Sequence, residues 1–273
     1  MKSVFDLQGR VIALTGAAGM LGTEFAKALA QYGASLALID IDTILLHPIV
    51  EEIRAKFDIR AVILNVDITN EAEVAKASEY AQEKLGPIYG LINNAARNPV
   101  VTQTGLDSGS RLEDFARETW DLDISVGLTG AYLCAKHFGP KIREAKSNGV
   151  IVNISSDLGL IAPDQRLYAN ESEPAGSQAV KPVSYSVVKT GIIGLTRYLA
   201  TYWPGEVRSN ALCLGGVIAD QDSTFVERVS KLIPLGRMAD RKEHANSMVY
   251  MMSDAASYMN GSIIALDGGR STW

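Results

Sequence analysis

Short apolar runs alternate with longer stretches of helical spacing along most of the chain. The apolar runs, each predicted as a strand, are 10–14, 35–39, 61–66, 88–92, 149–154, 207–212 and 262–266. The stretches with apolar residues at every third or fourth position, each predicted as a helix, are 19–32, 44–57, 71–85, 112–138 and 185–202. Strands that alternate with such helices favour right-handed βαβ units. The pattern therefore predicts an α/β protein with a doubly wound, seven-stranded parallel sheet and helices on both faces.

The alternation lapses over 162–182. This segment contains three prolines, a glycine and many charged or amide side chains. A loop of this length in a compact domain is usually a functional lid or poorly ordered. A second polar loop is predicted over 100–110, and no internal repeat or linker accompanies either loop. Residues 1–273 are therefore predicted to be a single domain with a substrate loop inserted at about 162–182.

Composition and charge narrow the classes of function. The chain has 273 residues, 47% of them apolar and 21% charged, which is typical of one large globular domain. Its net charge of -5 argues against a general nucleic-acid or anionic-membrane surface. No apolar run approaches the ~20 residues of a membrane span, and the N-terminus lacks the regions of a signal peptide. We expect a cytoplasmic protein that acts on a small molecule and has no nucleic-acid or membrane partner.

The cysteines and histidines give no sign of metal or disulfide chemistry. Cys134 and Cys213 are far apart in the sequence, and in a reducing compartment each is expected to be a small packed residue. His47, His137 and His244 are scattered and have no partner at ligand spacing. The sequence therefore predicts no metal site.

The segment Thr15-Gly16-Ala17-Ala18-Gly19-Met20-Leu21-Gly22 joins the first predicted strand to the first predicted helix. Glycines there allow a tight turn and the close approach of a pyrophosphate, which the N–H groups of the helix start attract. The predicted ligand is a dinucleotide, and the alternative is an ordinary small-residue turn. Asp40 follows the second strand at the place where an acidic side chain binds an adenosine ribose. Alternatively Asp40 caps a turn, and Asp42 competes for the ribose role.

Tyr185 and Lys189 are four residues apart and share one face of a predicted helix. A fixed positive charge near a tyrosine favours the phenolate and lowers a pKa that is ordinarily about 10. Such a pair is common on solvated helix faces, but this one follows a strand that ends at Ser156.

Asn93-Asn94-Ala95-Ala96 follows the fourth strand. The amide side chains there either hold neighbouring backbone groups or form only a turn.

In their order along the chain, these motifs resemble those of the classical short-chain dehydrogenases/reductases. The resemblance runs from about Leu7 to Trp273. Each motif alone is common, whereas their joint order is specific. The matching pieces are the glycine turn at 15–22, Asp40, Asp67, Asn93-Asn94-Ala95, Ser156, Tyr185 with Lys189, Gly215-Gly216-Val217 and Leu266-Asp267-Gly268-Gly269.

The resemblance implies an NAD(P)-dependent oxidoreductase that moves a hydride between nicotinamide and a carbonyl or secondary alcohol. Tyr185 would be the general acid or base, Lys189 would bind the nicotinamide ribose and lower the pKa of Tyr185, and Ser156 would donate a hydrogen bond to the substrate oxygen. Ser156 is preferred to Ser155 because the family's serine stands three residues before a glycine, here Gly159. The implied cofactor-binding residues are Gly16, Gly19, Met20, Leu21, Asp40, Asp67, Ile68, Asn94, Ala95, Tyr185, Lys189, Gly216 and Val217.

Two further expectations concern cofactor choice and assembly. Asp40 should select NAD(H), because its carboxylate repels a 2′-phosphate and the turn at 16–22 holds no basic residue. Relatives pair their long fourth and fifth helices across a twofold axis. The corresponding stretches here are apolar around more of their circumference than one buried stripe requires, which predicts a homotetramer. The alternative is that the inserted loop covers this surface.

The chain also departs from the family pattern. The spacing of Gly16, Gly19 and Gly22 is more usual in the extended branch of the family. Gly127 stands where many relatives carry an asparagine that holds a proton-relay water, and Leu214 stands where relatives often have proline. The gap between the predicted serine and tyrosine is longer than usual.

Two other functions therefore stay open: a catalytically silent dinucleotide-binding sensor or scaffold, and a nucleotide-sugar epimerase or dehydratase that returns the hydride to its substrate. The polar loop favours a polar, multiply hydroxylated substrate over a steroid or fatty acyl chain. Over 162–165, 181–203 and 234–238 the chain is similar to reductases associated with bacterial surface-sugar and flagellin modification. Substrate identity and reaction direction do not follow from the sequence.

Overall fold

The computed structural model describes residues 3–97, 109–169, 174 and 177–273. Seven parallel strands form one sheet in the order β3-β2-β1-β4-β5-β6-β7, which confirms the predicted fold class. Because the order reverses between β1 and β4, the connections after these strands diverge and open a crevice at their carboxyl ends. The strands are β1 (Val11–Thr15), β2 (Ser35–Asp40), β3 (Ala61–Asn65), β4 (Ile88–Asn93), β5 (Gly149–Ser156), β6 (Val207–Leu214) and β7 (Ile263–Leu266).

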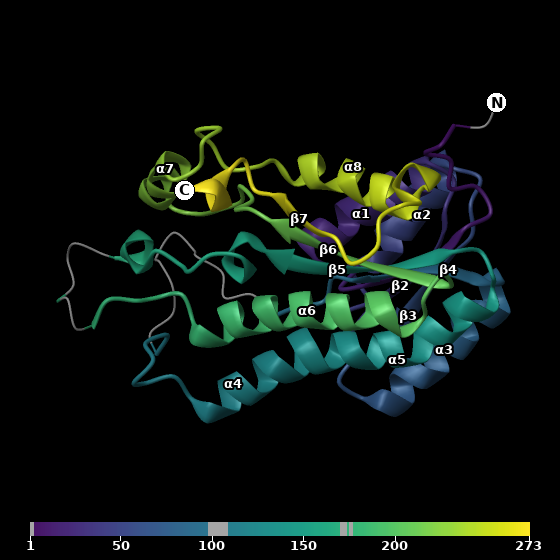
Figure 1. Cartoon of the computed structure of the whole chain (residues 1–273), viewed down its shortest axis with the longest axis horizontal. Coiled ribbons are helices and arrows are strands. Elements are labelled where there is room, and N and C mark those ends of the chain that lie inside the picture. Colours follow the sequence, from purple (N-terminus) through teal and green to yellow (C-terminus); the bar gives the residue numbers. More distant parts are fainter. Residues whose placement is uncertain (1–2, 98–108, 170–173, 175–176) are drawn as a thin grey trace.

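Helices cover both faces of the sheet (Figure 1). One layer consists of α1 (Met20–Gln31), α2 (Leu46–Lys56) and α8 (Arg241–Met252). The other consists of α3 (Glu71–Leu85), α4 (Arg117–Ile124), α5 (Gly130–Glu144) and α6 (Val183–Tyr202). The short helix α7 (Ser223–Lys231) lies beside the C-terminus, where Trp273 Nε1 donates to the Leu232 carbonyl at 2.9 Å. None of the described helices is both long and apolar enough to cross a membrane.

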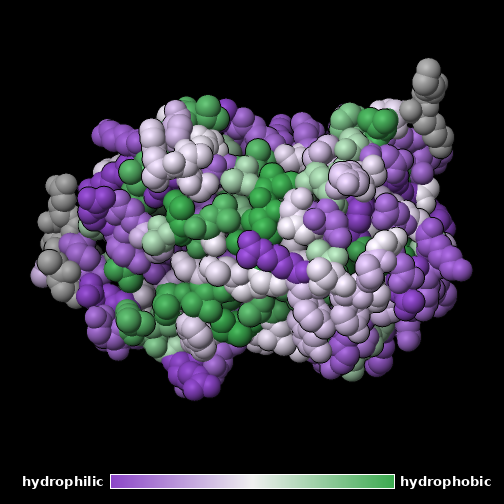
Figure 2. Space-filling model, viewed as in Figure 1, coloured by the Kyte–Doolittle hydropathy of each residue, from purple (hydrophilic) through white to green (hydrophobic). Residues whose placement is uncertain are grey.

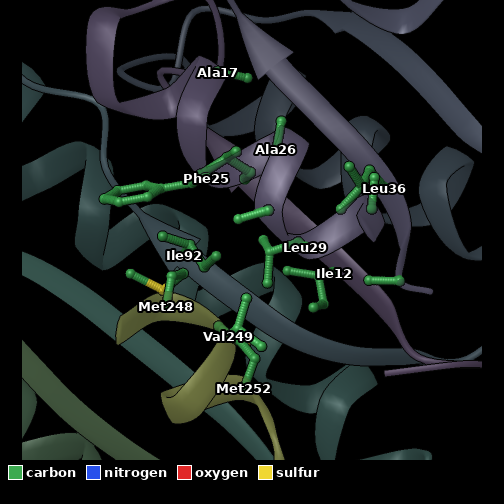
Figure 3. Packing of buried hydrophobic residues seen from close by; sticks show 14 of the residues in the cluster. Ile12, Ala17, Phe25, Ala26, Leu29, Leu36, Ile92, Met248, Val249 and Met252 are labelled. Carbon is green, nitrogen blue, oxygen red and sulfur yellow. The ribbon is translucent and has the colours of Figure 1, made fainter. Parts of the chain in front are cut away.

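Strand residues alternate between two buried layers. In β1, Ile12 and Leu14 face the layer that holds α1 and α8, whereas Val11 and Ala13 face the layer that holds α3 and α5. Strands β1, β4, β5 and β6 are buried on both faces, which is why they appear in the sequence as nearly continuous apolar runs. The side chains that pack on the first face (Figure 3) include Ile12, Phe25, Leu29, Ile92, Met248 and Met252.

The long helix predicted over 112–138 is not a single α-helix. It begins only at Arg117, and Ser125–Thr129 forms a π-helical turn between α4 and α5. Gly127 lies in this turn against α6, where an added Cβ would be 2.5 Å from a methyl carbon of Val188. The close approach of two helices at Gly127 is a tertiary contact, so the spacing of apolar residues could not indicate it.

The sequence pattern did not predict α7 and α8. Each begins at an aspartate that caps the free N–H groups of the first turn. Asp222 accepts hydrogen bonds from the N–H groups of Thr224 and Phe225, and Asp240 forms a capping box with Glu243. These caps are the sequence signals by which the two helices could have been found.

The described part of the segment 162–182 packs against α7. Gln165–Tyr168 forms a short 3-10 turn, and the Tyr168 ring centroid lies 5.6 Å from that of Phe225. The predicted loop at 100–110 lies almost entirely outside the described residues. Both cysteines are buried and free, in agreement with the prediction of a packing role.

Candidate active site

A cleft of about 970 Å³ lies at the carboxyl ends of the strands. All the residues predicted for catalysis or cofactor binding line it. They come from segments far apart in the sequence, and the parallel sheet brings these segments to one edge. The residues are Gly16, Gly19, Met20, Leu21, Asp40, Asp67, Ile68, Asn94, Ala95, Ser156, Tyr185, Lys189, Gly216 and Val217.

The glycine turn is held against the loop that follows β4. Gly16 has φ +63, and a Cβ there would lie 2.7 Å from Ala95 Cα. A Cβ at Gly22 would lie 2.1 Å from the Gly16 carbonyl oxygen. The Asn94 side-chain amide donates to the carbonyls of Thr15 at 3.1 Å and Gly16 at 2.9 Å. Asn94 therefore orients the turn, and only glycine fits at its two closest approaches.

Asp40 ends β2 beside this turn. Its carboxylate accepts the Ala18 N–H at 2.9 Å through Oδ2 and the Asp42 N–H at 3.1 Å through Oδ1. Asp42, the competing acid, is exposed and accepts the Ile44 N–H at 3.1 Å. Of the two acids, Asp40 is the one tied to the glycine turn, and a carboxylate oxygen can accept more than one hydrogen bond.

Asp67 lies in the loop after β3, next to Ile68. Its Oδ1 accepts the backbone N–H of Thr69 at 2.9 Å and the hydroxyl of the same residue at 2.7 Å. These bonds fix the loop and orient the carboxylate at the end of the cleft that also holds Asp40. Two acids therefore lie where the sequence places the adenosine half of a dinucleotide.

Tyr185 lies in the first turn of α6, and its surroundings favour the neutral phenol. Burial raises the pKa of Tyr185 to about 12, and a hydrogen bond with Ser156 opposes this rise. Lys189 is not among the groups that shift this pKa, so its expected effect on the tyrosine stays a prediction. The Lys189 ammonium donates to the Ile154 carbonyl at 3.1 Å.

Lys189 lies one helical turn beyond the tyrosine and is only 6% exposed. Its ammonium is 5.7 Å from the centroid of the Tyr185 ring. Burial lowers the pKa of Lys189 to about 8. The tyrosine and the lysine predicted to act together are therefore neighbours in a desolvated part of the cleft.

The two serines at the end of β5 have different partners. Ser155 donates to the Lys189 backbone carbonyl at 2.7 Å and so ties β5 to α6. Ser156 lines the cleft, donates to Asp157 Oδ1 at 2.6 Å and accepts the Leu158 N–H at 3.2 Å. Burial raises the pKa of Asp157. The structure therefore places Ser156, rather than Ser155, beside Tyr185.

Sequence reasoning missed two cations in this part of the cleft. Lys181, from the inserted segment, places its ammonium 3.8 Å from the centroid of the Tyr185 ring, and burial lowers its pKa to about 8. Arg270 reaches the cleft from the turn after β7 and is 9% exposed. Lys181 could have been found from the four-residue spacing of Lys181, Tyr185 and Lys189. Arg270 had no such signal.

Gly127 leaves no room for the relay asparagine of many relatives, because a Cβ there would already meet Val188 at 2.5 Å.

The cleft itself fits a dinucleotide. A backbone turn that excludes any Cβ borders the cleft, a carboxylate lies at one end, and a phenol and an ammonium lie at the other. Among the described residues, no group of three or more His, Cys, Asp or Glu side chains could hold a metal ion.

Comparisons with known proteins agree with this geometry. A family model described as enoyl-(acyl carrier protein) reductase matches residues 16–271. The chain is 32% identical to galactitol 2-dehydrogenase (L-tagatose-forming) of Cereibacter sphaeroides, over 100% of this chain and 99% of the relative. It is 29% identical to an NADP-dependent mannitol dehydrogenase of Alternaria alternata, over 98% and 95% of the two chains.

Among solved structures, a short-chain type dehydrogenase/reductase from Mycobacterium marinum superposes with a TM-score of 0.82 at 27% identity, over 99% of both chains. The similarity thus extends over nearly the whole chain in both sequence and structure. The chain belongs to the short-chain dehydrogenase/reductase family.

Proposed function

We propose that this protein is an NAD-dependent oxidoreductase that interconverts a secondary alcohol and a carbonyl in a polar, polyol-like or sugar-like substrate. The observation that supports this most directly is the grouping of Ser156, Tyr185 and Lys189 at one end of a dinucleotide-sized cleft. The relatives named for galactitol and mannitol support a hydroxylated substrate. The similarity to surface-sugar and flagellin-modifying reductases stays a prediction.

The residues of the chain would bind the cofactor, bind the substrate oxygen and transfer the proton. The dinucleotide, when bound, supplies the hydride acceptor or donor, and Gly16, Asp40 and Lys189 would hold its two halves. Ser156 would turn its hydroxyl from Asp157 Oδ1 and donate a hydrogen bond to the substrate oxygen, which would stabilise charge that develops there. In the oxidative direction Tyr185 would accept the proton of the substrate hydroxyl, and in the reductive direction it would return it.

Burial opposes the phenolate that proton acceptance requires, so nearby cations are needed. Lys181 and Lys189 both lie near the Tyr185 ring, at 3.8 and 5.7 Å from its centroid. Protonated, each would favour the phenolate through Coulomb attraction, which is strong where water is excluded. The tyrosine would therefore act together with two lysines rather than with Lys189 alone.

NAD is the proposed cofactor because Asp40 presents a carboxylate where the 2′-phosphate of NADP would lie. The relative from Alternaria alternata is described as NADP-dependent, so family membership alone does not decide the cofactor. The carboxylate is held by two backbone N–H groups and cannot turn far from this position without breaking them.

A panel of polyols, ketoses and nucleotide-sugars, assayed at 340 nm with NAD(H) and NADP(H), tests the proposal. We expect NAD-linked turnover that Tyr185→Phe abolishes while NADH affinity changes little. Tyr198→Phe, on the exposed face of the same helix, is the control and should keep full activity. Tight dinucleotide binding without turnover would favour a silent sensor. Isomerised product without net absorbance change would favour an epimerase.

A further inference from the structure

Charge is divided between the two ends of the cleft. Three acids, Asp40, Asp42 and Asp67, lie at the ends of β2 and β3. At the other end, near Tyr185, the lining contains three cations and one acid, apart from Arg97, whose Nε is 3.7 Å from Asp123 Oδ1. These four residues are Lys181, Lys189, Arg270 and Asp157. The proposed function uses Lys189 for the cofactor and Lys181 beside the tyrosine, but it gives neither Lys181 nor Arg270 a contact with the substrate.

Arg270 is the more unusual of these two. It begins the 3-10 turn Arg270–Thr272 after β7 and is 9% exposed. Among the residues that the structure describes, no hydrogen bond or ion pair satisfies its guanidinium. Its nitrogen atoms are not among the fully buried side-chain atoms without a partner, so the guanidinium keeps contact with the open cleft. Since Arg270 lines the cleft, a bound ligand can supply the hydrogen-bond acceptors and the negative charge that the described residues do not supply.

The acids around Arg270 are already engaged. Asp267, which is three residues earlier, accepts the backbone N–H groups of Gly269 and Ser271, both at 2.9 Å. Asp164 accepts two hydrogen bonds from the Arg166 side chain, at 2.9 and 2.7 Å. Asp157 bonds to Ser156 and Leu158 and lies near enough to Arg270 only for a longer-range attraction.

Lys181 adds a second positive charge at the same end. It is 8% exposed and lies over the Tyr185 ring at 3.8 Å, so its ammonium is held near the reacting phenol. Its backbone N–H donates to the Gln165 side chain at 2.8 Å, which anchors this part of the inserted segment. Asp157 is within electrostatic range of both Lys181 and Arg270, so the two cations surround one region of the cleft.

We propose that Arg270 and Lys181 form an anion subsite, and that the substrate carries a carboxylate or a phosphate ester besides its hydroxyl groups. A guanidinium presents a planar pair of donors that matches both anions, whereas an ammonium adds charge without that geometry. The proposal rests on the proposed function, since it gives the alcohol or ketone substrate an acidic group. It separates this protein from relatives that are named for uncharged polyols.

The test compares three ligands that share a six-carbon hydroxylated chain: sorbitol, gluconate and sorbitol 6-phosphate. Their affinities are measured calorimetrically with the NADH-loaded protein, so that the result does not depend on turnover. We expect gluconate or sorbitol 6-phosphate to bind at least tenfold more tightly than sorbitol. The better of the two identifies the anion as a carboxylate or a phosphate ester.

Variants then assign the preference to the subsite. Arg270→Gln should remove the tenfold difference while NADH affinity is kept, and Arg270→Lys should retain part of it. Lys181→Gln gives a second measurement if the first variant does not fold, and it should also weaken anion binding. Lys231→Gln removes an exposed charge on α7, paired with Glu227, and should change nothing.

The proposal is overturned if sorbitol binds as tightly as both anions, if none of the three ligands binds, or if Arg270→Gln keeps the anion preference. The last result would mean that Arg270 only balances Asp157 at a distance. The proposed function fails separately. One result would support the anion subsite and contradict the proposed dehydrogenase activity. In that result, anion binding depends on Arg270, but no compound of the wider panel gives or accepts a hydride.

Discussion

The ammonium of Lys189 lies 5.7 Å from the centroid of the Tyr185 ring, and burial drives the two groups toward their neutral forms. It raises the pKa of the tyrosine to about 12 and lowers that of the lysine to about 8. At neutral pH the tyrosine is therefore uncharged, and only the charge of the lysine is maintained against desolvation. Such opposed pKa shifts in a cleft are typical of functional sites, where stability is given up for chemistry.

Replacement of Lys189 should stabilise the fold. The lowered pKa means that the unfolded chain binds more protons than the folded chain between about pH 8 and 10.5, so wild-type stability should rise through this window. At pH 7, below the folded-state pKa of about 8, the buried lysine is mostly protonated. Lys189→Met should then be more stable by up to about 3 kcal/mol at pH 7, with the difference shrinking toward pH 10.5.

Urea unfolding of both proteins at pH 7 and pH 10 measures this effect, and NADH titration should show weaker cofactor binding for Lys189→Met. Lys76→Met removes an exposed lysine from α3 and should leave stability nearly unchanged. A Lys189→Met variant that is less stable than wild type at pH 7 would contradict the prediction.

Asp40→Ala should narrow the preference for NADH over NADPH. The substitution removes the charge that repels a 2′-phosphate and two hydrogen bonds to the adjacent backbone. We expect the ratio of kcat/KM values for the two cofactors to fall by about ten- to a hundredfold, since one charge interaction is worth about 1.4–2.8 kcal/mol here. Asp42→Ala is the matched control and should keep the ratio. A fall only with Asp42→Ala would transfer the role to that residue.

Gly16→Ala should destabilise the protein by more than about 3 kcal/mol or prevent folding, because a Cβ would lie 2.7 Å from the Ala95 backbone at a φ of +63. Gly9→Ala separates the effect of the close contact from the effect of the positive φ. Gly9 has φ +83 but nothing within 4 Å of the added Cβ, so only the left-handed strain of about 1–2 kcal/mol should appear. Equal losses at both positions, measured by urea unfolding, would show that close approach is unimportant.

The face formed by α4, α5 and α6 should mediate assembly into a homotetramer. Figure 2 shows hydrophobic residues gathered where Figure 1 draws α4 and part of α6, and Leu122, Tyr132, Val187 and Tyr198 are 40–60% exposed. The described part of the inserted loop therefore does not cover them. Tyr198→Glu should reduce the mass measured by light scattering, whereas Tyr80→Glu on α3 should not. A wild-type monomer at micromolar concentration would rule out the assembly.

Much of the fold follows from local sequence patterns. Each of the seven apolar runs overlaps one of the seven strands, and the central strands are continuously apolar because both of their faces are buried. The turn at Gly16 and the acid at Asp40 could be placed at one edge because parallel strands all end there. The tyrosine and lysine of α6 could be paired because four residues make about one helical turn.

Tertiary structure alone decided the rest. The close contact of Gly127 with Val188 of α6 joins two separate helices, and the pKa values of Tyr185 and Lys189 depend on how completely other segments bury them. Arg270 reaches the cleft from the far end of the chain, 85 residues after Tyr185. The spacing of residues along the chain predicts which side chains are neighbours within one helix or strand. Burial and contacts between distant segments arise only when the helices and strands pack together.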